Sequence, residues 1–355
     1  MTATADTIVV GAGVIGLCVA EALARRGRSV ALVGDRRAGE ASRAAAGMLA
    51  PSVEQSEGPA HDFAIAARDF YPGFLETLAD STGIRVPLNR LGILQVALSD
   101  RGVRGLRKTA AVTSRWLDRG EIADLEPTLA HANGAVFNPD DGAVDNVVLM
   151  SALEAAVDRS AQVTRFEATA FSVSRDHPSV QLSSGETLAG QHVIVAAGAW
   201  GKSLEGAQAM KDVSPCRGQL VSYAPIGLRH VTYGPRGYLV PRASGAIVAG
   251  STMEYVGYDS TTTPAGLAKV RSAAEEIAPA LAIAQVTDEW AGLRPVTPDM
   301  LPIIGPDESS PHIIYASGHS RNGILMAPLT GETVAALTVG DDSGYDLSQF
   351  RPGRF

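Results

Sequence analysis

The stretch that decides the fold is Thr7–Val33, TIVVGAGVIGLCVAEALARRGRSVALV. It opens with Ile8–Val10, a short β-branched run without helical period, which is typical of a strand buried on both faces. Helical spacing follows over Leu17–Arg26, and Val30–Val33 has the composition of a second buried strand. The order of strand, glycine-rich turn, helix and second strand predicts a βαβ unit.

The turn in this unit carries the spacing G-x-G-x-x-G. Gly11 allows the tight turn, Gly13 lets a pyrophosphate approach the backbone, and Gly16 lets the helix pack close to the strand. Because the helix directs its free N–H groups toward the phosphates, we expect Val14 and Ile15 to line the site as well. With a strand before the turn and a helix after it, the stretch predicts a Rossmann-like dinucleotide-binding site.

Length and composition set broad limits on the protein. A chain of 355 residues, 45% of them hydrophobic, favours a globular protein of two domains. A formal net charge of −8 without long Lys/Arg runs argues against nucleic acid or an anionic membrane as a partner. With no bilayer-length apolar run and no leader-like N-terminus, we expect a cytoplasmic protein; its oligomeric state stays open, a homo-oligomer included. Cys18 and Cys216 provide neither a disulfide framework nor a metal-ligand spacing, so no metal is expected.

The position that should bind the adenosine ribose is irregular. Gly34 stands where a ribose-binding carboxylate is usual, and Asp35 follows one residue later. Either Asp35 or Arg36 is therefore expected to take that role. The pair Arg36–Arg37 would also suit a 2′-phosphate, and hence an NADP-binding reductase or binding protein, while a solvated basic turn is the simpler interpretation.

Small residues dominate Gly39–Pro51, GEASRAAAGMLAP. This run forms no amphipathic helix, but it would let the backbone lie flat against a large planar group, with Ser42 and Arg43 available to a pyrophosphate. The start of a plain Ala-rich helix is the alternative. A later buried strand also ends in small residues, at Ala196–Trp200, so the backbone is expected to approach a ligand there too.

The middle of the chain changes character. An alternating segment at Val86–Leu98 predicts a strand, and two helical stretches follow with an expected break near Arg119–Gly120. Short alternating strands between Arg217 and Met253 then predict an antiparallel sheet. The predicted fold class is α/β plus α+β, a Rossmann-like cofactor domain with an inserted antiparallel-sheet substrate domain. The expected boundaries are 1–85, 141–213 and 288–355 for the cofactor domain and 86–140 and 214–287 for the substrate domain.

Six segments, in order along nearly the whole chain, carry a family resemblance. They are VVGAGVIGL (9–17), SRAAAGMLAP (42–51), VIVAAGAW (193–200), YLVPRASGAIVAGSTME (238–254), WAGLRPVTPDMLPIIG (290–305) and ASGHSRNGILMAPLTG (316–331). Together they resemble the D-amino-acid oxidase family of FAD-dependent oxidoreductases, in particular its glycine oxidase (ThiO-like) and sarcosine oxidase branch. The last two segments are the most specific.

The resemblance implies FAD in the first domain, with the flavin ring under the antiparallel sheet. Attachment is expected to be noncovalent, because no cysteine other than Cys18 stands near the flavin-facing motifs. A helix beginning near Ile324 would direct its positive dipole at the flavin N1 and C2 carbonyl. The implied cofactor-binding residues are Gly11, Gly13, Val14, Ile15, Gly16, Asp35, Arg36, Ser42, Arg43, Ala46, Gly47, Met48, Ala170, Ala197, Gly198, Trp200, Arg294, Arg321, Asn322, Gly323, Ile324 and Leu325.

The implied catalytic residues are Arg294, Tyr238, Arg321, Met253 and Met48. Arg294 lies in an apolar neighbourhood, where its planar guanidinium suits a substrate carboxylate through two parallel hydrogen bonds. An arginine that bridges the domains through a protein carboxylate is the alternative for this residue.

The remaining candidates have less definite roles. Tyr238 would hydrogen-bond the same carboxylate or be an ordinary strand aromatic, and the two methionines would shape the walls. Arg321 touches substrate or flavin, or else closes a loop. His319 is suggestive of a general base, but the family chemistry requires none, so a structural role is favoured.

The implied reaction is oxidation of the C–N bond of a small amino acid or amine such as glycine, sarcosine or a small D-amino acid. Hydride would pass from the α-carbon to flavin N5, giving an imine that hydrolyses to oxo acid and ammonia, with O2 reduced to H2O2. With glycine, the product would feed thiazole synthesis for thiamin. The alternatives are a dehydrogenase with a non-oxygen acceptor or, if Arg236 points inward, an oxidase of a substrate with a second anionic group.

Overall fold

The computed structural model describes residues 3–54, 57–110 and 113–355. A six-stranded sheet forms around the predicted βαβ unit, in which β2 (Thr7–Val10) leads through α1 (Val14–Arg25) to β3 (Val30–Val33). The strand order is β10–β3–β2–β14–β21–β20, and all neighbours are parallel except the antiparallel pair β20–β21. The other strands are β10 (Val163–Phe166), β14 (His192–Val195), β20 (Ile303–Pro306) and β21 (Ile313–Ser317).

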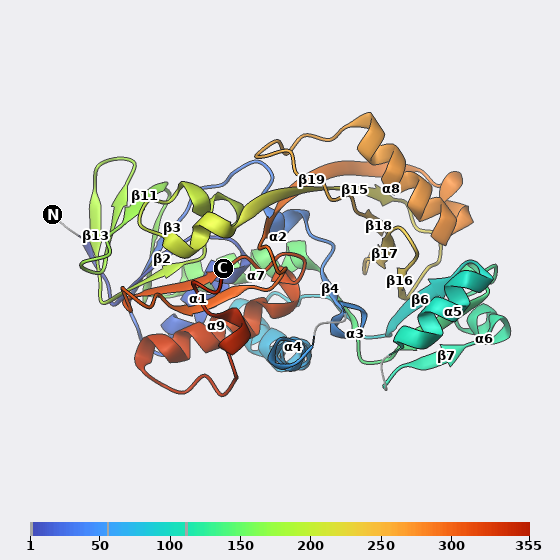
Figure 1. The fold of residues 1–355 in the computed structure, drawn as a ribbon, viewed down its shortest axis with the longest axis horizontal. Helices are drawn as coiled ribbons and strands as arrows, with labels where there is room; N and C mark the ends of the chain where they lie inside the picture. Colours follow the sequence, from blue (N-terminus) through green and yellow to red (C-terminus); the bar gives the residue numbers. More distant parts are fainter. Residues whose placement is uncertain (1–2, 55–56, 111–112) are drawn as a thin grey trace.

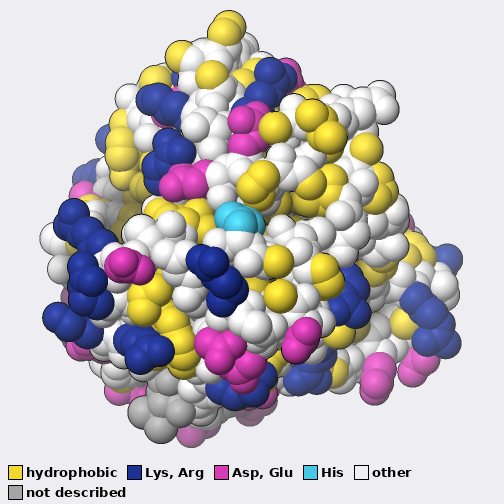
Figure 2. Space-filling model, turned by 90° about the vertical axis from the view of Figure 1, so that its right-hand side faces the viewer, with side chains coloured by type: hydrophobic (Ala, Val, Ile, Leu, Met, Phe, Trp, Pro, Cys, Tyr) yellow, Lys and Arg dark blue, Asp and Glu magenta, His cyan; other side chains and the backbone are white. Residues whose placement is uncertain are grey.

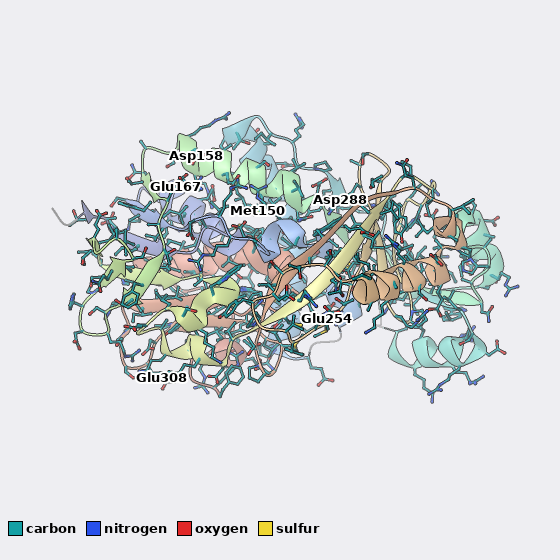
Figure 3. The ribbon with its side chains drawn as sticks, turned by 90° about the horizontal axis from the view of Figure 1, so that it is seen from above. Met150, Asp158, Glu167, Glu254, Asp288 and Glu308 are labelled. Carbon is teal, nitrogen blue, oxygen red and sulfur yellow. The ribbon has the colours of Figure 1, made fainter. Side chains whose placement is uncertain are left out.

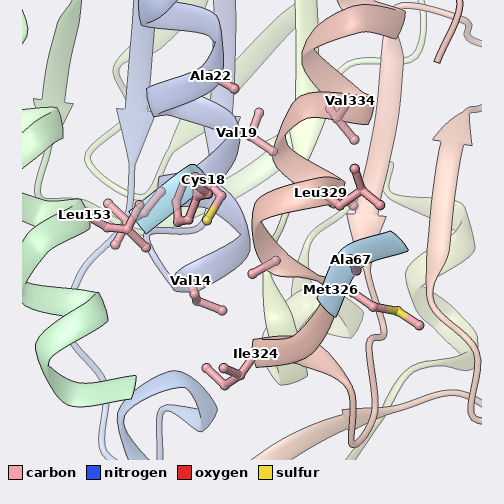
Figure 4. Packing of buried hydrophobic residues seen from close by; sticks show 14 of the residues in the cluster. Val14, Cys18, Val19, Ala22, Ala67, Leu153, Ile324, Met326, Leu329 and Val334 are labelled. Carbon is pink, nitrogen blue, oxygen red and sulfur yellow. The ribbon is translucent and has the colours of Figure 1, made fainter. Parts of the chain in front are cut away.

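Helices cover one face of this sheet. Beside α1 lie α4 (Pro59–Thr82), α7 (Asn146–Arg159) and α9 (Gly323–Val339). Figure 4 shows α1 between α7 and α9, with Val19 on the side of α1 that faces α9. A Cβ on Gly331 of α9 would lie 2.7 Å from the backbone oxygen of Cys18, so the glycine lets these two helices pack in close contact.

A small sheet packs against the opposite face, through a second apolar cluster that includes Val10, Val33 and Val180. Its strand order is β1–β13–β12–β11. Its bounds are β1 (Ala3–Thr4), β13 (Thr187–Ala189), β12 (Ser179–Leu182) and β11 (Ala170–Val173).

An eight-stranded sheet forms the other half of the molecule, in the order β19–β15–β18–β17–β16–β6–β8–β7. The strands between Arg217 and Met253 pair antiparallel, as expected. Every other neighbouring pair is antiparallel as well except β16 and β6, which are parallel. The bounds are β19 (Val286–Val296), β15 (Ser214–Tyr223), β18 (Ile247–Gly250), β17 (Tyr238–Pro241), β16 (Val231–Tyr233), β6 (Ile93–Ala97), β8 (Gly134–Asn138) and β7 (Arg115–Leu117).

The two longest strands of this sheet, β15 and β19, pair over their whole length and extend from one half of the molecule to the other (Figure 1). Glu254 lies beside them (Figure 3), where its backbone exchanges hydrogen bonds with Arg217 of β15. Helix α8 (Pro264–Ile277) packs on this sheet through its buried apolar residues.

Shorter elements join the two halves. A three-stranded sheet has the order β4–β9–β5. The remaining bounds are β4 (Met48–Leu49), β9 (Gly142–Val144), β5 (Leu88–Asn89), α2 (Ala41–Ala44), α3 (Pro51–Glu54), α5 (Asp100–Thr109), α6 (Arg119–Leu125) and the 3-10 turns η1 (Pro127–Leu129), η2 (Gly198–Ser203), η3 (Gln208–Asp212), η4 (Pro279–Ala282) and η5 (Ser348–Phe350).

Two local predictions differ from the structure. The break expected near Arg119–Gly120 was wrong, because α6 begins there and strand β7 separates the two helices. Asp118 and Glu121 form a capping box that starts α6, and this signature outweighs the glycine. The strand expected over Val86–Leu98 is divided into β5 and β6, with a left-handed glycine, Gly92, between them.

The surface carries charges of both signs. On the face shown in Figure 2, Lys and Arg side chains lie among Asp and Glu side chains instead of forming one basic area. Among the helices of the described residues, none is both long enough and apolar enough to cross a membrane.

A buried hydrogen bond between a carboxylate and an imidazole ties α6 to the eight-stranded sheet. The carboxylate of Glu126, fully buried, lies 2.7 Å from Nδ1 of His230 and accepts hydrogen bonds from the backbone N–H groups of Arg229 and His230. Burial raises the pKa of Glu126, but these hydrogen bonds outweigh it and hold the pKa below its usual 4.5. The charged carboxylate therefore stabilises the fold above that pH.

We expect Glu126→Gln to lower the free energy of unfolding by about 2–4 kcal/mol at pH 7, because it breaks a buried, charge-assisted network. The difference from wild type should narrow as the pH falls below about 4.5, since the wild-type carboxylate then also loses its charge. Urea unfolding at several pH values measures both effects. Exposed Glu186→Gln is the control, and an equal loss in both variants would contradict the assignment.

Candidate active site

A cavity of about 560 Å³ opens where the carboxyl ends of the parallel strands meet the eight-stranded sheet. It brings together the following predicted residues: Gly11, Gly13, Val14, Ile15, Asp35, Ser42, Ala46, Gly47, Met48, Ala170, Ala197, Gly198, Trp200, Tyr238, Met253, Arg294, Arg321, Gly323 and Ile324. Five others lie outside its lining, namely Gly16, Arg36, Arg43, Asn322 and Leu325.

One end of the cavity is the glycine turn before α1. Gly11 has φ +114°, and a Cβ there would lie 2.2 Å from the backbone oxygen of Ala196, so only glycine fits. Gly16 packs directly on the Gly11 carbonyl, which is why it is outside the lining. The backbone N–H of Val14 donates to Oγ of Ser42 at 3.0 Å, which brings the small-residue stretch against the start of α1.

Of the two residues predicted for the ribose, Asp35 lies in the cavity lining and Arg36 does not. Asp35 lines the cavity, and its two oxygens accept hydrogen bonds from Arg37 at 3.0 Å and from Oγ1 of Thr169 at 2.9 Å. Each carboxylate oxygen keeps a further lone pair for a ligand. Burial raises the pKa of Asp35, but the bonds from Arg37 and Thr169 outweigh it and lower the pKa below its usual value. A Cβ on Gly34 would lie 2.8 Å from Ala12, so the residue is confined to glycine here.

The basic residues nearby point elsewhere. Arg36 is 71% exposed and pairs with Glu154 at 3.2 Å, and Arg43 pairs with the same carboxylate at 2.7 Å. Arg37 pairs with Asp35 and lies over the ring of Trp200, 5.6 Å from its centroid. Each of the three arginines thus pairs with an acidic side chain, although Arg36 and Arg43 share one carboxylate, so none of them is free of a partner for the 2′-phosphate of NADP.

Two helix N-termini open on the cavity, those of the 12-residue α1 and the 17-residue α9. Neither has a side-chain cap or an acidic residue in its first turn, so their positive ends are free to face a ligand. Gly323 and Ile324 line the cavity at α9, Asn322 is the residue before the helix and makes no side-chain capping bond, and Leu325 is buried in the core. A cavity with one positive helix end at a glycine turn and a second farther along fits a group that is negative at two places, as FAD is.

His319 also lines the cavity, but it is buried and bonded through Nε2 to Oγ1 of Thr330 at 3.2 Å. Burial lowers its pKa to about 3, so the ring is neutral at physiological pH. This supports the structural role expected for His319.

Arg294 lies at the other end of the cavity, on β19. Its guanidinium donates to Oγ of Ser251 and, at 3.2 Å, to the backbone oxygen of Thr252. A Cβ on Gly218 of β15 would lie 2.2 Å from Nη1 of Arg294, so the glycine makes room for the side chain. Within residues 3–54, 57–110 and 113–355, no carboxylate forms an ion pair with Arg294, so the bridging alternative has no partner there.

Arg321 differs from Arg294 because it has an acidic partner. Its Nη2 lies 2.8 Å from Oε1 of Glu54, and both side chains face the cavity. Burial raises the pKa of Glu54, against the opposing effects of Arg321 and Arg294. Sequence reasoning missed Glu54, Thr169 and Tyr233, since none of them stands in a recognisable spacing.

Arg236 lines the cavity mouth and turns toward α8. Its Nε lies 2.7 Å from Oε2 of Glu276, its Nη2 donates to Ser272, and its side chain is 57% exposed. Arg236 therefore points outward, so it gives no support to a substrate with a second anionic group.

We expect Asp35→Asn to weaken FAD binding about tenfold, because it removes a charged acceptor at the ribose position. Arg36→Gln is the matched control and should leave the affinity within about twofold, since Arg36 lies outside the cavity. Titration of apoprotein with FAD, followed by flavin fluorescence, measures both. A larger loss in Arg36→Gln than in Asp35→Asn would assign the role to Arg36 instead.

Known proteins share this architecture. Residues 6–337 match the DAO family, described as FAD dependent oxidoreductase. The chain is 33% identical over 368 residues to the bifunctional protein ThiO/ThiG of Synechocystis sp., matching all of this chain but spanning 55% of that protein. It is 32% identical over 366 residues to the glycine oxidase of Geobacillus kaustophilus, covering 99% of this chain and 97% of that one.

The crystal structure of glycine oxidase from Geobacillus kaustophilus superposes with a TM-score of 0.93 over 100% of both chains, at 30% identity. This agreement confirms the predicted fold class, a Rossmann-like FAD-binding domain with a substrate domain, while the domain boundaries given above stay a prediction. The family match over most of the chain confirms the resemblance and the FAD cofactor. The chain belongs to the DAO family of FAD-dependent oxidoreductases.

Proposed function

We propose that this protein oxidises the C–N bond of a small amino acid or amine with one carboxylate, with glycine as the first candidate and dioxygen as the acceptor. The observation that carries the proposal is Arg294, a cavity-facing guanidinium on β19 with no acidic partner among the described residues. A half-buried cation that the protein leaves uncompensated suits a substrate anion. The glycine oxidases among the relatives support the choice of substrate class.

Arg294 would act as the substrate anchor. Ser251 and Thr252 hold the guanidinium in place, and its remaining N–H donors are available to a carboxylate. Tyr238 lines the same end, and its ring lies against the Gly250 backbone, where a Cβ would meet the hydroxyl at 2.5 Å. The hydroxyl of Tyr238 would give the carboxylate a second hydrogen bond and fix its orientation.

Positioning would supply the catalysis. When bound, FAD accepts the hydride from the substrate α-carbon and passes the electrons on to the acceptor. A carboxylate fixed by Arg294 and Tyr238 leaves the α-carbon little freedom, and Met48 and Met253 would shape the walls around it. His319 is neutral and bonded to Thr330, so it takes no proton in this scheme.

The product would be an imine that water hydrolyses to an oxo acid and ammonia. A related chain occurs within the ThiO/ThiG protein of Synechocystis sp.. Thiazole synthesis for thiamin is therefore the proposed consumer of the product when the substrate is glycine.

Anaerobic mixing of the FAD-loaded protein with glycine, sarcosine and D-alanine tests the proposal. We expect at least one of them to bleach the flavin absorbance, and admission of air to restore it with one H2O2 per turnover. Bleaching followed by slow reoxidation would indicate a dehydrogenase that uses another acceptor. No bleaching with any of the three would contradict the proposed substrate class.

We expect Arg294→Ala to raise the half-saturating glycine concentration about 30-fold or more, because the carboxylate loses its charged partner. The half-saturating glycine concentration of Arg294→Lys should lie between those of wild type and Arg294→Ala, because lysine keeps the positive charge but cannot form two parallel hydrogen bonds to a carboxylate. Arg271→Lys is the control. Arg271 of α8 pairs with Glu289, which lies on β19 like Arg294 but outside the cavity lining. Flavin reduction rates against glycine concentration give the values, and an unchanged half-saturation in Arg294→Ala would refute the anchor.

A further inference from the structure

The charges at the substrate end of the cavity balance except at one residue. Three arginines line this end, Arg236, Arg294 and Arg321. Arg236 is compensated by Glu276 on α8, and Arg321 by Glu54. Among these described lining residues, Arg294 alone has no ion pair with a carboxylate, which leaves its guanidinium available to one substrate carboxylate.

Glu54 is held in place from both sides. It ends α3, whose Ser52 donates from its backbone N–H and its hydroxyl to the buried carboxylate of Asp141, at 3.1 and 3.0 Å. Asp141 in turn pairs with Arg68 of α4 at 3.0 Å. The Glu54 side chain is 14% exposed, so its position is fixed by the fold and not by solvent.

Arg321 is the more exposed member of the pair, at 43%, and would be free to turn toward a ligand if Glu54 were neutral. Tyr233 lies on the same wall. Its burial raises the pKa of its hydroxyl, and the negative charge of Glu54 raises that pKa further. This hydroxyl is buried and has no hydrogen bond in good geometry among the described residues. The Tyr233 hydroxyl thus lies close enough to Glu54 and Arg321 for both to act on it.

We propose that Glu54 is a specificity-determining residue that neutralises Arg321 and restricts the site to substrates with a single carboxylate. The ion pair of Glu54 and Arg321 blocks a second anion in two ways: it occupies the guanidinium, and its carboxylate repels an incoming acid. Neutral Glu54 would leave two cations, Arg294 and Arg321, in one cavity, which suits a dicarboxylic amine. This inference deepens the proposed function and rests on its assignment of Arg294 to the substrate carboxylate.

Binding of inert acids separates this inference from the reaction itself. Acetate carries one carboxylate, and malonate, succinate and glutarate carry two at increasing separation. Their dissociation constants follow from the change that each produces in the visible spectrum of the FAD-loaded protein. Because no turnover is needed, failure of the oxidase proposal would leave this measurement interpretable.

In Glu54→Gln, at least one diacid should gain about tenfold or more in affinity relative to acetate. The double variant Glu54→Gln/Arg321→Gln should lose that gain, because the freed guanidinium is what binds the second carboxylate. Glu276→Gln is the matched control. It removes the acidic partner of Arg236, whose side chain faces α8, and should change the diacid-to-acetate affinity ratio by less than about twofold.

Three results would overturn the proposal. The first is that the wild-type protein binds a diacid more tightly than acetate. The second is that the diacid-to-acetate affinity ratio of Glu54→Gln stays within about twofold of wild type for all three diacids. The third is that Glu276→Gln gains as much diacid affinity as Glu54→Gln. The wild-type measurement stands even if Glu54→Gln fails to retain FAD. As a further readout, Glu54→Gln should oxidise iminodiacetate faster relative to glycine than the wild type does.

Discussion

The pairing of β19 between two partners is the constraint on which the site depends. On one side it follows β15 from Ser214 to Tyr223. On the other side the backbone N–H of Leu293 donates to the carbonyl of Gly39 at 2.8 Å. This second contact joins the substrate sheet to the small-residue stretch that runs along the cofactor cavity. Arg294 follows Leu293 directly, so the same bond that joins the two halves places its guanidinium at the cavity.

Charge compensation is a second constraint, and it decides what the site can bind. Arg36 and Arg43 share Glu154, Arg217 is held by Glu254 and Asp259, and Arg321 is held by Glu54. A buried cation without a partner is unfavourable, and Arg217 and Arg321 each meet a carboxylate where they leave solvent. Arg294 lines the cavity on β19 without an ion pair to any carboxylate among the described residues, which is why we propose that it binds the substrate carboxylate.

Much of this could be predicted from the sequence because the signals are local or carried by a family resemblance. Thr7–Val33 contains its own strand, turn and helix chemistry, and it folds as β2, α1 and β3. The segments around Arg294 and Gly323 were recognised as motifs, and both lie at the cavity. The sequence did not predict the ion pairs whose two residues lie far apart in the chain. Nothing near Arg36 in sequence indicates Glu154, and Glu54 is separated from Arg321 by 267 positions. The break expected near Gly120 is a local exception: it was wrong because the capping box of Asp118 and Glu121 overrides the glycine.

The central claim is that FAD and a substrate carboxylate meet at Arg294. A crystal structure of the FAD-loaded protein with bound acetate tests it most directly. The account predicts the acetate oxygens at about 2.7–2.9 Å from the Arg294 guanidinium, in the two-bond arrangement of an arginine and a carboxylate. It also predicts that Arg321 still pairs with Glu54. Acetate bound to Arg321 instead, with Arg294 turned away to a protein carboxylate, would contradict the account.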